Sequence, residues 1–180
     1  MTMRRLCFPV LTGLVLLAGA PATAQEGLDD PAIERWIAAH AGKSKGAEHR
    51  NSRRAVTGDL DGDGLSDVAV LYTIEADKPK EFSLRYLAVF RRGPDGLRYE
   101  AHRLVGGKGI REINRATVLN RVIVLEALEY QPRDAVCCPS RPARWRYRLR
   151  ERQLVEVKAA ASATAKRKEK DGKEKQMAPK

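Results

Sequence analysis

Four aspartates lie within a short glycine-containing segment, residues 58–67, at positions 1, 3, 5 and 9 of a loop. Carboxylates that a tight turn brings together repel one another unless they are neutralised. Ca²⁺ takes roughly six to eight oxygen ligands and removes that repulsion. We therefore expect a Ca²⁺ site here, with an acidic glycine turn that holds no metal as the alternative. The expected ligands are the side chains of Asp59, Asp61 and Asp63, the backbone carbonyl of Leu65, and the closing carboxylate of Asp67.

The residues after the loop separate it from an EF-hand. An EF-hand requires a glutamate at position 12 and a following helix. Position 12 here is Val70, within the apolar run Val68–Tyr72, which predicts a strand. The pattern Asp-x-Asp-Gly-Asp-Gly-x-x-Asp before a strand resembles the calcium loops of FG-GAP/VCBS-type repeats. The resemblance covers about 20 residues. It implies the metal loop but not the propeller of those repeats, because the motif occurs once and a propeller needs several blades.

The first 24 residues have the pattern of a secretory signal peptide. Arg4 and Arg5 precede an apolar run, Leu6–Ala20, and Ala22-Thr23-Ala24 forms an Ala-x-Ala cleavage site before Gln25. The run is shorter than the ~20 residues that a membrane-spanning helix needs. We expect cleavage and a periplasmic or secreted chain without a transmembrane segment, the alternative being an uncleaved anchor.

The rest of the chain predicts one domain and a tail. Residues 25–157 are enough for a single β-rich domain. The net charge of +11 is concentrated at the C-terminus, where residues 158–180 hold eight Lys or Arg against three Asp or Glu. This Ala/Lys-rich segment has no apolar face, so we expect a disordered basic tail. It either keeps the protein soluble or docks weakly on a polyanion.

Apolar periodicity predicts one helix followed by strands. Asp29 or Asp30 is positioned to cap a helix that starts at Pro31 and stops near Gly42, with Trp36 anchoring it on a sheet. Beyond it the apolar period is two, and short turn-forming links join the segments. This favours an antiparallel meander, a sandwich- or blade-like sheet in a mainly β fold. The expected strands are residues 54–58, 67–75, 83–92, 97–105, 111–118, 121–130, 143–150 and 153–157.

One predicted strand alternates aromatic and basic residues. Trp145, Tyr147 and Leu149 share one face, and four arginines share the other. A half-buried strand with a solvated basic face explains this pattern. Because the aromatic residues are needed in the core, we do not expect nucleic-acid binding.

Two adjacent cysteines, Cys137 and Cys138, remain once Cys7 leaves with the signal peptide. They could form a vicinal disulfide, stay as thiols or pair with other chains. Two cysteines without a histidine partner make a poor zinc site, and the Cys-x-x-Cys spacing of redox motifs is absent. An oxidising compartment favours a vicinal disulfide that stiffens the loop before the Trp145 strand.

A broader resemblance joins these features. The export signal and the segments 58–64, 86–90 and 134–140 are similar to a group of small exported bacterial proteins of uncharacterised function. The similarity spans roughly residues 54–157. It implies an all-β domain with an FG-GAP/VCBS-type calcium loop and a Cys-Cys-Pro-Ser loop, and it transfers no catalytic residue.

The sequence favours binding over catalysis. Nothing in it groups the three histidines, His40, His49 and His102, and it has no recognisable catalytic triad order or phosphate loop. We expect an exported, calcium-stabilised, non-catalytic binding or structural domain of the bacterial envelope, whose partner is an envelope protein or a polyanion. The alternatives are a metal-dependent hydrolase that uses the same aspartates, or a polyanion-binding protein that acts through its basic tail.

Overall fold

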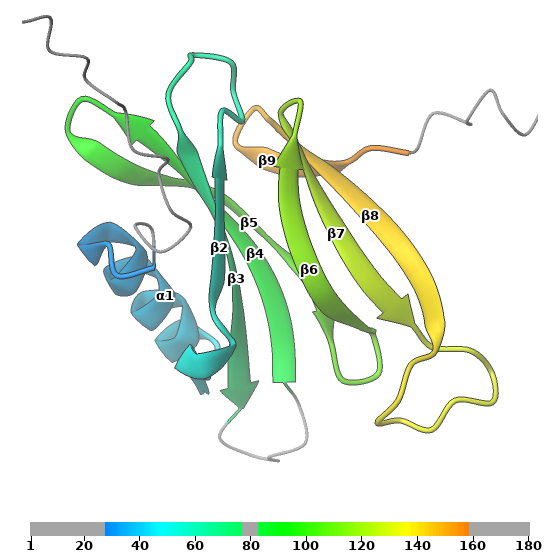
Figure 1. The fold of residues 1–180 in the computed structure, drawn as a ribbon. Helices are drawn as coiled ribbons and strands as arrows, with labels where there is room; N and C mark the ends of the chain where they lie inside the picture. Colours follow the sequence, from blue (N-terminus) through cyan, green and yellow to red (C-terminus); the bar gives the residue numbers. More distant parts are fainter. Residues whose placement is uncertain (1–27, 77–82, 159–180) are drawn as a thin grey trace, which may run out of the picture.

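The protein is an antiparallel β-meander with one helix near its N-terminus, as the sequence predicted (Figure 1). The computed structural model describes residues 28–76 and 83–158, so the expected signal peptide and all but the first residue of the expected tail lie outside them. The strands are β1 Gly46–Glu48, β2 Arg54–Gly58, β3 Asp67–Ala76, β4 Ser83–Gly93, β5 Gly96–Gly107, β6 Arg111–Leu119, β7 Val122–Glu129, β8 Arg141–Arg150 and β9 Gln153–Glu156. None of the helices in these ranges has the length and hydropathy to cross a membrane.

The helix α1, Pro31–Lys43, starts where its capping residues predict. The Asp30 side chain accepts a hydrogen bond from the backbone N–H of Ala32 at 2.8 Å, and Pro31 occupies the first turn. Ile33 and Ile37 face the sheet and are fully buried. The helix runs one residue beyond the predicted stop at Gly42.

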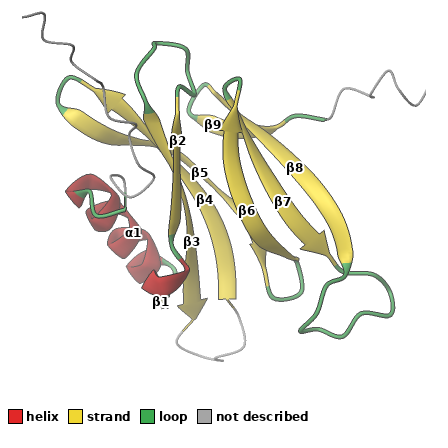
Figure 2. Ribbon diagram, in the orientation of Figure 1, coloured by secondary structure: helices red, strands yellow, loops and turns green. Residues whose placement is uncertain are grey.

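The sheet curls so that its central strands are covered on both faces. Hydrogen-bonded strands follow the order β1-β3-β4-β5-β6-β7-β8-β9, with β2 also paired to β3. The link between β5 and β6 is a single residue pair, Gly107 with Arg111. There the meander folds back, so that β6 contacts β2 and β9 contacts β5. One of the latter contacts is a 3.0 Å hydrogen bond from Arg103 Nη1 to the carbonyl of Leu154. The result is a sandwich-like arrangement with α1 at one side of the sheet (Figure 2), where it contacts β1 and β5.

Two apolar clusters share the central strands. Val70 and Tyr72 of β3 pack with α1 in one cluster, while Leu71 of the same strand packs with β6–β9 in the other. The alternation continues in β4, where residues 87–90 are all fully buried. The centre of this strand is therefore buried on both faces.

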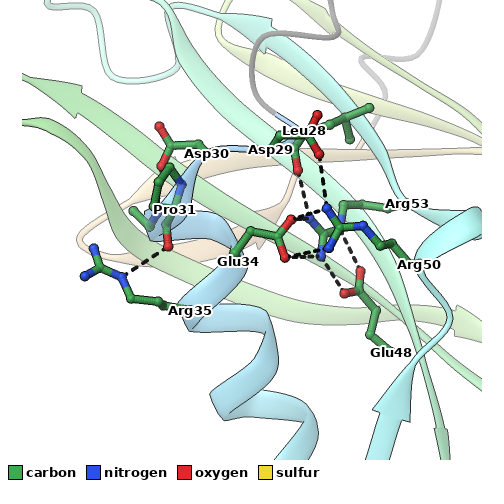
Figure 3. A network of polar contacts seen from close by, with 10 residues as sticks. Leu28, Asp29, Asp30, Pro31, Glu34, Arg35, Glu48, Arg50 and Arg53 are labelled. Carbon is green, nitrogen blue, oxygen red and sulfur yellow. Dashed lines mark hydrogen bonds and ion pairs between the residues drawn. The ribbon is translucent and has the colours of Figure 1, made fainter.

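The sequence missed β1, which lies in a segment expected to be a loop. Three residues without an apolar alternation give no strand signal. β1 pairs with the end of β3 and carries Glu48 to Arg53, a residue that is only 4 % exposed. Arg53 forms ion pairs with Glu34 and Glu48 and donates to the carbonyl of Leu28 at 2.8 Å (Figure 3). The network ties α1 to the edge of the sheet.

Candidate metal site

The acidic loop closes the hairpin between β2 and β3. The two strands pair up to Gly58 and Asp67, and Asp67 is the first residue of β3. The strands therefore fix both ends of the loop, which lies at one end of the sheet's strands (Figure 1). Leu60, near its start, is 2 % exposed and belongs to the apolar cluster that β6–β9 cover. The loop conformation is thus coupled to the core.

Three of the four predicted aspartates converge. One carboxylate oxygen from each of Asp59, Asp61 and Asp67 lies within 4.8 Å of the other two. Asp63 is not in this group, and its Oδ1 accepts a hydrogen bond from the backbone N–H of Leu65 at 2.8 Å. The structure thus brings together part of the expected ligand set, and the roles of Asp63 and of the Leu65 carbonyl stay predictions.

Asp67 is the buried anchor of the loop. Its Oδ2 accepts from the backbone N–H of Leu60 at 3.0 Å, and its Oδ1 accepts from that of Arg92 at 2.9 Å. Burial raises the pKa of Asp67, the two N–H donors oppose the shift, and the charges of Asp61 and Asp63 add to it. A cation in the loop would favour the ionised form of this carboxylate.

The loop aspartates also fold the loop itself. Asp59 accepts hydrogen bonds from the backbone N–H groups of Gly62 at 2.5 Å and Gly64 at 3.3 Å, and Asp61 accepts from that of Asp63 at 3.1 Å. Gly62 has a φ of 98°, in the region that favours glycine. The chain bends at the glycines, as the sequence suggested.

Two arginines that the sequence did not indicate lie against the loop. Arg91 Nε of β4 is 2.7 Å from Asp61 Oδ2. The guanidinium of Arg121, in the β6–β7 turn, packs against Gly62 so closely that a Cβ there would lie 2.5 Å from its Nη1. These cations neutralise part of the acidic charge, which is what the metal-free alternative requires. The sequence did not indicate them because one lies in a distant strand and the other in a distant turn.

The structure corrects one expectation about the histidines. The rings of His40 on α1 and His102 on β5 lie 4.7 Å apart, although no sequence signal grouped them. Each Nδ1 is hydrogen-bonded to a tyrosine hydroxyl, that of Tyr72 for His40 at 2.8 Å and that of Tyr99 for His102 at 2.7 Å. They belong to an aromatic cluster under α1, in which Trp36 stacks on Tyr99. Within the described ranges, the group of side chains that could hold a metal ion contains neither histidine.

The cysteine loop lies at the other end of the sheet. Cys137 and Cys138 are joined by a vicinal disulfide, as predicted. Asp134 holds the loop by accepting hydrogen bonds from the backbone N–H groups of Gln131 at 2.8 Å and Ser140 at 2.9 Å. Tyr130 donates from its hydroxyl to the carbonyl of Val136 at 2.6 Å.

Comparison with known proteins returned no match to a family model, to a curated protein or to a solved structure.

Proposed function

We propose that the chain is an exported, non-catalytic binding domain of the bacterial envelope and that Ca²⁺ in the β2–β3 loop stabilises its fold. The observation that carries the proposal is the convergence of Asp59, Asp61 and Asp67, whose carboxylate oxygens lie within 4.8 Å of one another. Carboxylate oxygens are the ligands that Ca²⁺ prefers, and backbone carbonyls and water can complete its coordination.

Calcium at this position would act on the whole domain. It would offset the repulsion among the aspartates and hold the loop over the core, where Leu60 is buried. It would also favour ionised Asp67, whose pKa is raised by burial and by its acidic neighbours. Extracellular calcium modules bind with a Kd of about 10⁻⁴ to 10⁻³ M, which suits an exported protein.

A binding role fits this site better than catalysis. A catalytic metal centre keeps an open coordination position beside a general acid or base. Within the described ranges, the group of side chains that could hold a metal ion consists of aspartates alone, without histidine, glutamate or cysteine. Its buried member, Asp67, is already engaged by two backbone N–H groups.

A calcium-dependent melting temperature tests the proposal. At a hundredfold excess over Kd, Ca²⁺ should stabilise the protein by about 2.7 kcal/mol, and EDTA should reverse the effect. Each kcal/mol corresponds to a rise in Tm of about 4 °C for a domain of this size. Differential scanning calorimetry across a calcium titration measures the rise.

The variant Asp59→Asn, Asp61→Asn should lose the calcium-dependent rise, because it removes two of the three converging charges. Asp95→Asn is the matched control, since Asp95 lies in the β4–β5 turn and outside the acidic group. An equal rise in both variants would mean that calcium acts at another site, and no rise in the wild type would mean that the loop does not hold calcium and that Arg91 and Arg121 balance its charge.

A further inference from the structure

A second polar site lies at the end of the sheet opposite the acidic loop. There the β5–β6 turn, the lower ends of β3 and β4 and the cysteine loop between β7 and β8 lie at the same end of the sheet (Figure 1). Residues from these segments line an open cavity of about 410 Å³. Its size is that of a small-ligand pocket, for which roughly 300 Å³ is the lower bound. Thr73, Arg85, Lys108, Arg111 and Tyr130 are among its lining residues.

The charge of this cavity is positive. Arg85, Lys108 and Arg111 line it, and Glu112 is the one acidic residue among its described lining residues. The Glu112 side chain is exposed, and no ion pair joins it to these cations within the described ranges. The cavity therefore presents cations without a matching carboxylate.

Arg85 is the most telling of the three. Its Nη1 donates to Thr73 Oγ1 at 2.8 Å, while its Nε is shielded from solvent and has no hydrogen-bond partner in the described part of the chain. Burial lowers its pKa, and nearby Arg54 adds to that effect. Arg85 is half-buried, and an arginine that is partly withdrawn from water is stabilised by an anionic partner. Arg53, with its two glutamates, shows that this domain pairs a buried arginine elsewhere.

Arg111 repeats the pattern. Its Cζ lies 3.5 Å from the centroid of the Trp145 ring, so the guanidinium rests on an aromatic surface. Its Nε is also shielded and unpaired in the described ranges. A guanidinium held on an aromatic ring is pre-organised to donate two parallel hydrogen bonds to one anion.

The backbones of β4 and of the β5–β6 turn pass close to each other beside the cavity. Gly107 has a φ of 135°, and a Cβ there would run into the carbonyl oxygen of Ser83. This contact brings β4 and the β5–β6 turn together, so that Arg85 and Lys108 line one space. The hydroxyls of Thr73 and Ser83 add neutral donors to the same wall.

The remaining wall is apolar and comes from the cysteine loop. Val136, Cys137 and Pro139 line the cavity, and Pro139 is buried whereas Val136 is 61 % exposed. The vicinal disulfide and the hydrogen bonds of Asp134 hold this loop in shape. One side of the cavity thus suits an anion, and the other suits an organic group attached to it.

We propose that this cavity binds a phosphate monoester or diester, with Arg85, Lys108 and Arg111 on the phosphoryl oxygens and the cysteine loop against the organic part. Two fixed arginines match the geometry of a phosphoryl group, and Lys108 and the hydroxyls serve its remaining oxygens. The inference rests on the proposed function only in treating the domain as a binding module. Calcium plays no part in it, because the two sites lie at opposite ends of the strands.

Calorimetric titration of the full chain with phenyl phosphate tests the proposal, with inorganic phosphate as a second probe. Phenyl phosphate should bind more tightly than inorganic phosphate, because the apolar wall contacts its ring. Arg85→Gln should weaken binding by about tenfold or more, the typical loss of one charged hydrogen bond. Arg98→Gln is the matched control, since Arg98 lies at the opposite end of β5 and outside the cavity, and it should bind as the wild type does.

A second variant guards against loss of fold. Arg111→Gln removes packing on Trp145, whereas Lys108→Gln changes an exposed turn residue. Lys108→Gln should weaken binding with an unchanged Tm. Arg85→Gln should have a Tm equal to or above that of the wild type without ligand, because it removes a half-buried charge that has no ion-pair partner in the described ranges.

Vesicles distinguish the source of the phosphoryl group. Binding to phosphatidylglycerol vesicles but not to phosphatidylcholine vesicles, lost in Arg85→Gln, would identify a lipid headgroup, and binding of phenyl phosphate alone would identify a soluble ester. If neither probe binds in a manner that depends on Arg85 and Lys108, or if Arg98→Gln weakens binding equally, the proposal is wrong. A calcium-insensitive Tm leaves these outcomes unchanged, so the two proposals fail separately.

Discussion

At the scale of single residues, the arginines that are buried or half-buried have two kinds of surroundings. Arg53 is enclosed by the carboxylates of Glu34 and Glu48, while the shielded Nε atoms of Arg85 and Arg111 have no partner in the described ranges. The carboxylates raise the pKa of Arg53 against the opposing effect of burial, and Arg53 in turn lowers the pKa of Glu34. The ion pairs of Arg53 hold α1 against the sheet. The unpaired Nε atoms of Arg85 and Arg111 are what we expect of a site that binds an anion.

Removing Arg53 should destabilise the domain strongly. Arg53→Gln leaves Glu48 without its counter-charge and Glu34 with the exposed Arg50 alone, and a loss of about 3–5 kcal/mol is typical when one partner of a buried ion pair is removed. Urea unfolding followed by circular dichroism measures it. Arg50→Gln is the control, because Arg50 also contacts Glu34 but has a side chain that is 60 % exposed, so its loss should stay below about 1 kcal/mol. Equal effects of the two substitutions would contradict a structural role for the buried pair.

Candidate site residues were recognisable in the sequence only where the chain brings them together locally. Asp59, Asp61 and Asp67 were recognisable because one loop holds all three. Arg91 contacts the same loop from β4 and Arg121 contacts it from the β6–β7 turn, and no local sequence pattern predicts such contacts. Asp63 was assigned by spacing alone, which does not show that its carboxylate turns back to its own loop.

At the scale of elements, alternation and turn chemistry were informative. The predicted strands match β2–β9 within a few residues at their ends. In the reversal between β6 and β7, Asn120 and Arg121 have positive φ values, 50° and 62°, and asparagine is a residue type that favours them. The turn at Glu151 and Arg152 has similar values, 46° and 62°, but neither residue type signals it. The contact between α1 and β5 brings His40 and His102 together. The sequence did not indicate this pair, because side chains that meet across two elements leave no pattern in a single sequence.

The histidine pair under α1 predicts loss of stability in mild acid. Burial lowers the pKa of His40 and of His102 below the ordinary value of 6.5, and the charge of His102 lowers that of His40 further. The unfolded chain then binds more protons than the folded one at and below pH 6.5, so stability falls as the pH drops through 6.5 toward the folded-state values. Tm measured from pH 8 to pH 5 should show this decline.

Matched histidine variants assign the effect to the pair. His40→Gln should flatten the decline, because a neutral amide replaces the imidazole beside His102 and Lys43. His49→Gln should keep it, since His49 lies apart at the exposed edge, where it bonds to Glu75 at 2.9 Å. A pH profile that His40→Gln leaves unaltered would place the sensitivity elsewhere.

At the scale of the whole molecule, the sequence predicted the meander but not how it closes. Alternating apolar residues state that a strand has a buried face, not which element covers it. Residues 87–90 of β4 are all buried, so both faces of this strand are covered. The structure shows that α1 covers one side and β6–β9 cover the other. The fold-back occurs where β5 and β6 share one residue pair, a feature that spacing does not encode.

This closure predicts that both layers unfold together. The chain has two tryptophans, and each reports on a different cluster: Trp36 packs on the α1 side and Trp145 on the β6–β9 side. Because β3 and β4 supply side chains to both clusters, losing either layer exposes the strands that support the other. In Trp145→Phe and Trp36→Phe variants, the fluorescence of the remaining tryptophan should therefore give a urea transition coincident with that variant's own circular dichroism curve. A Trp36 transition that precedes the loss of sheet signal would mean that α1 detaches first. The aromatic cluster would then be a separable layer laid over a sheet that is stable without it.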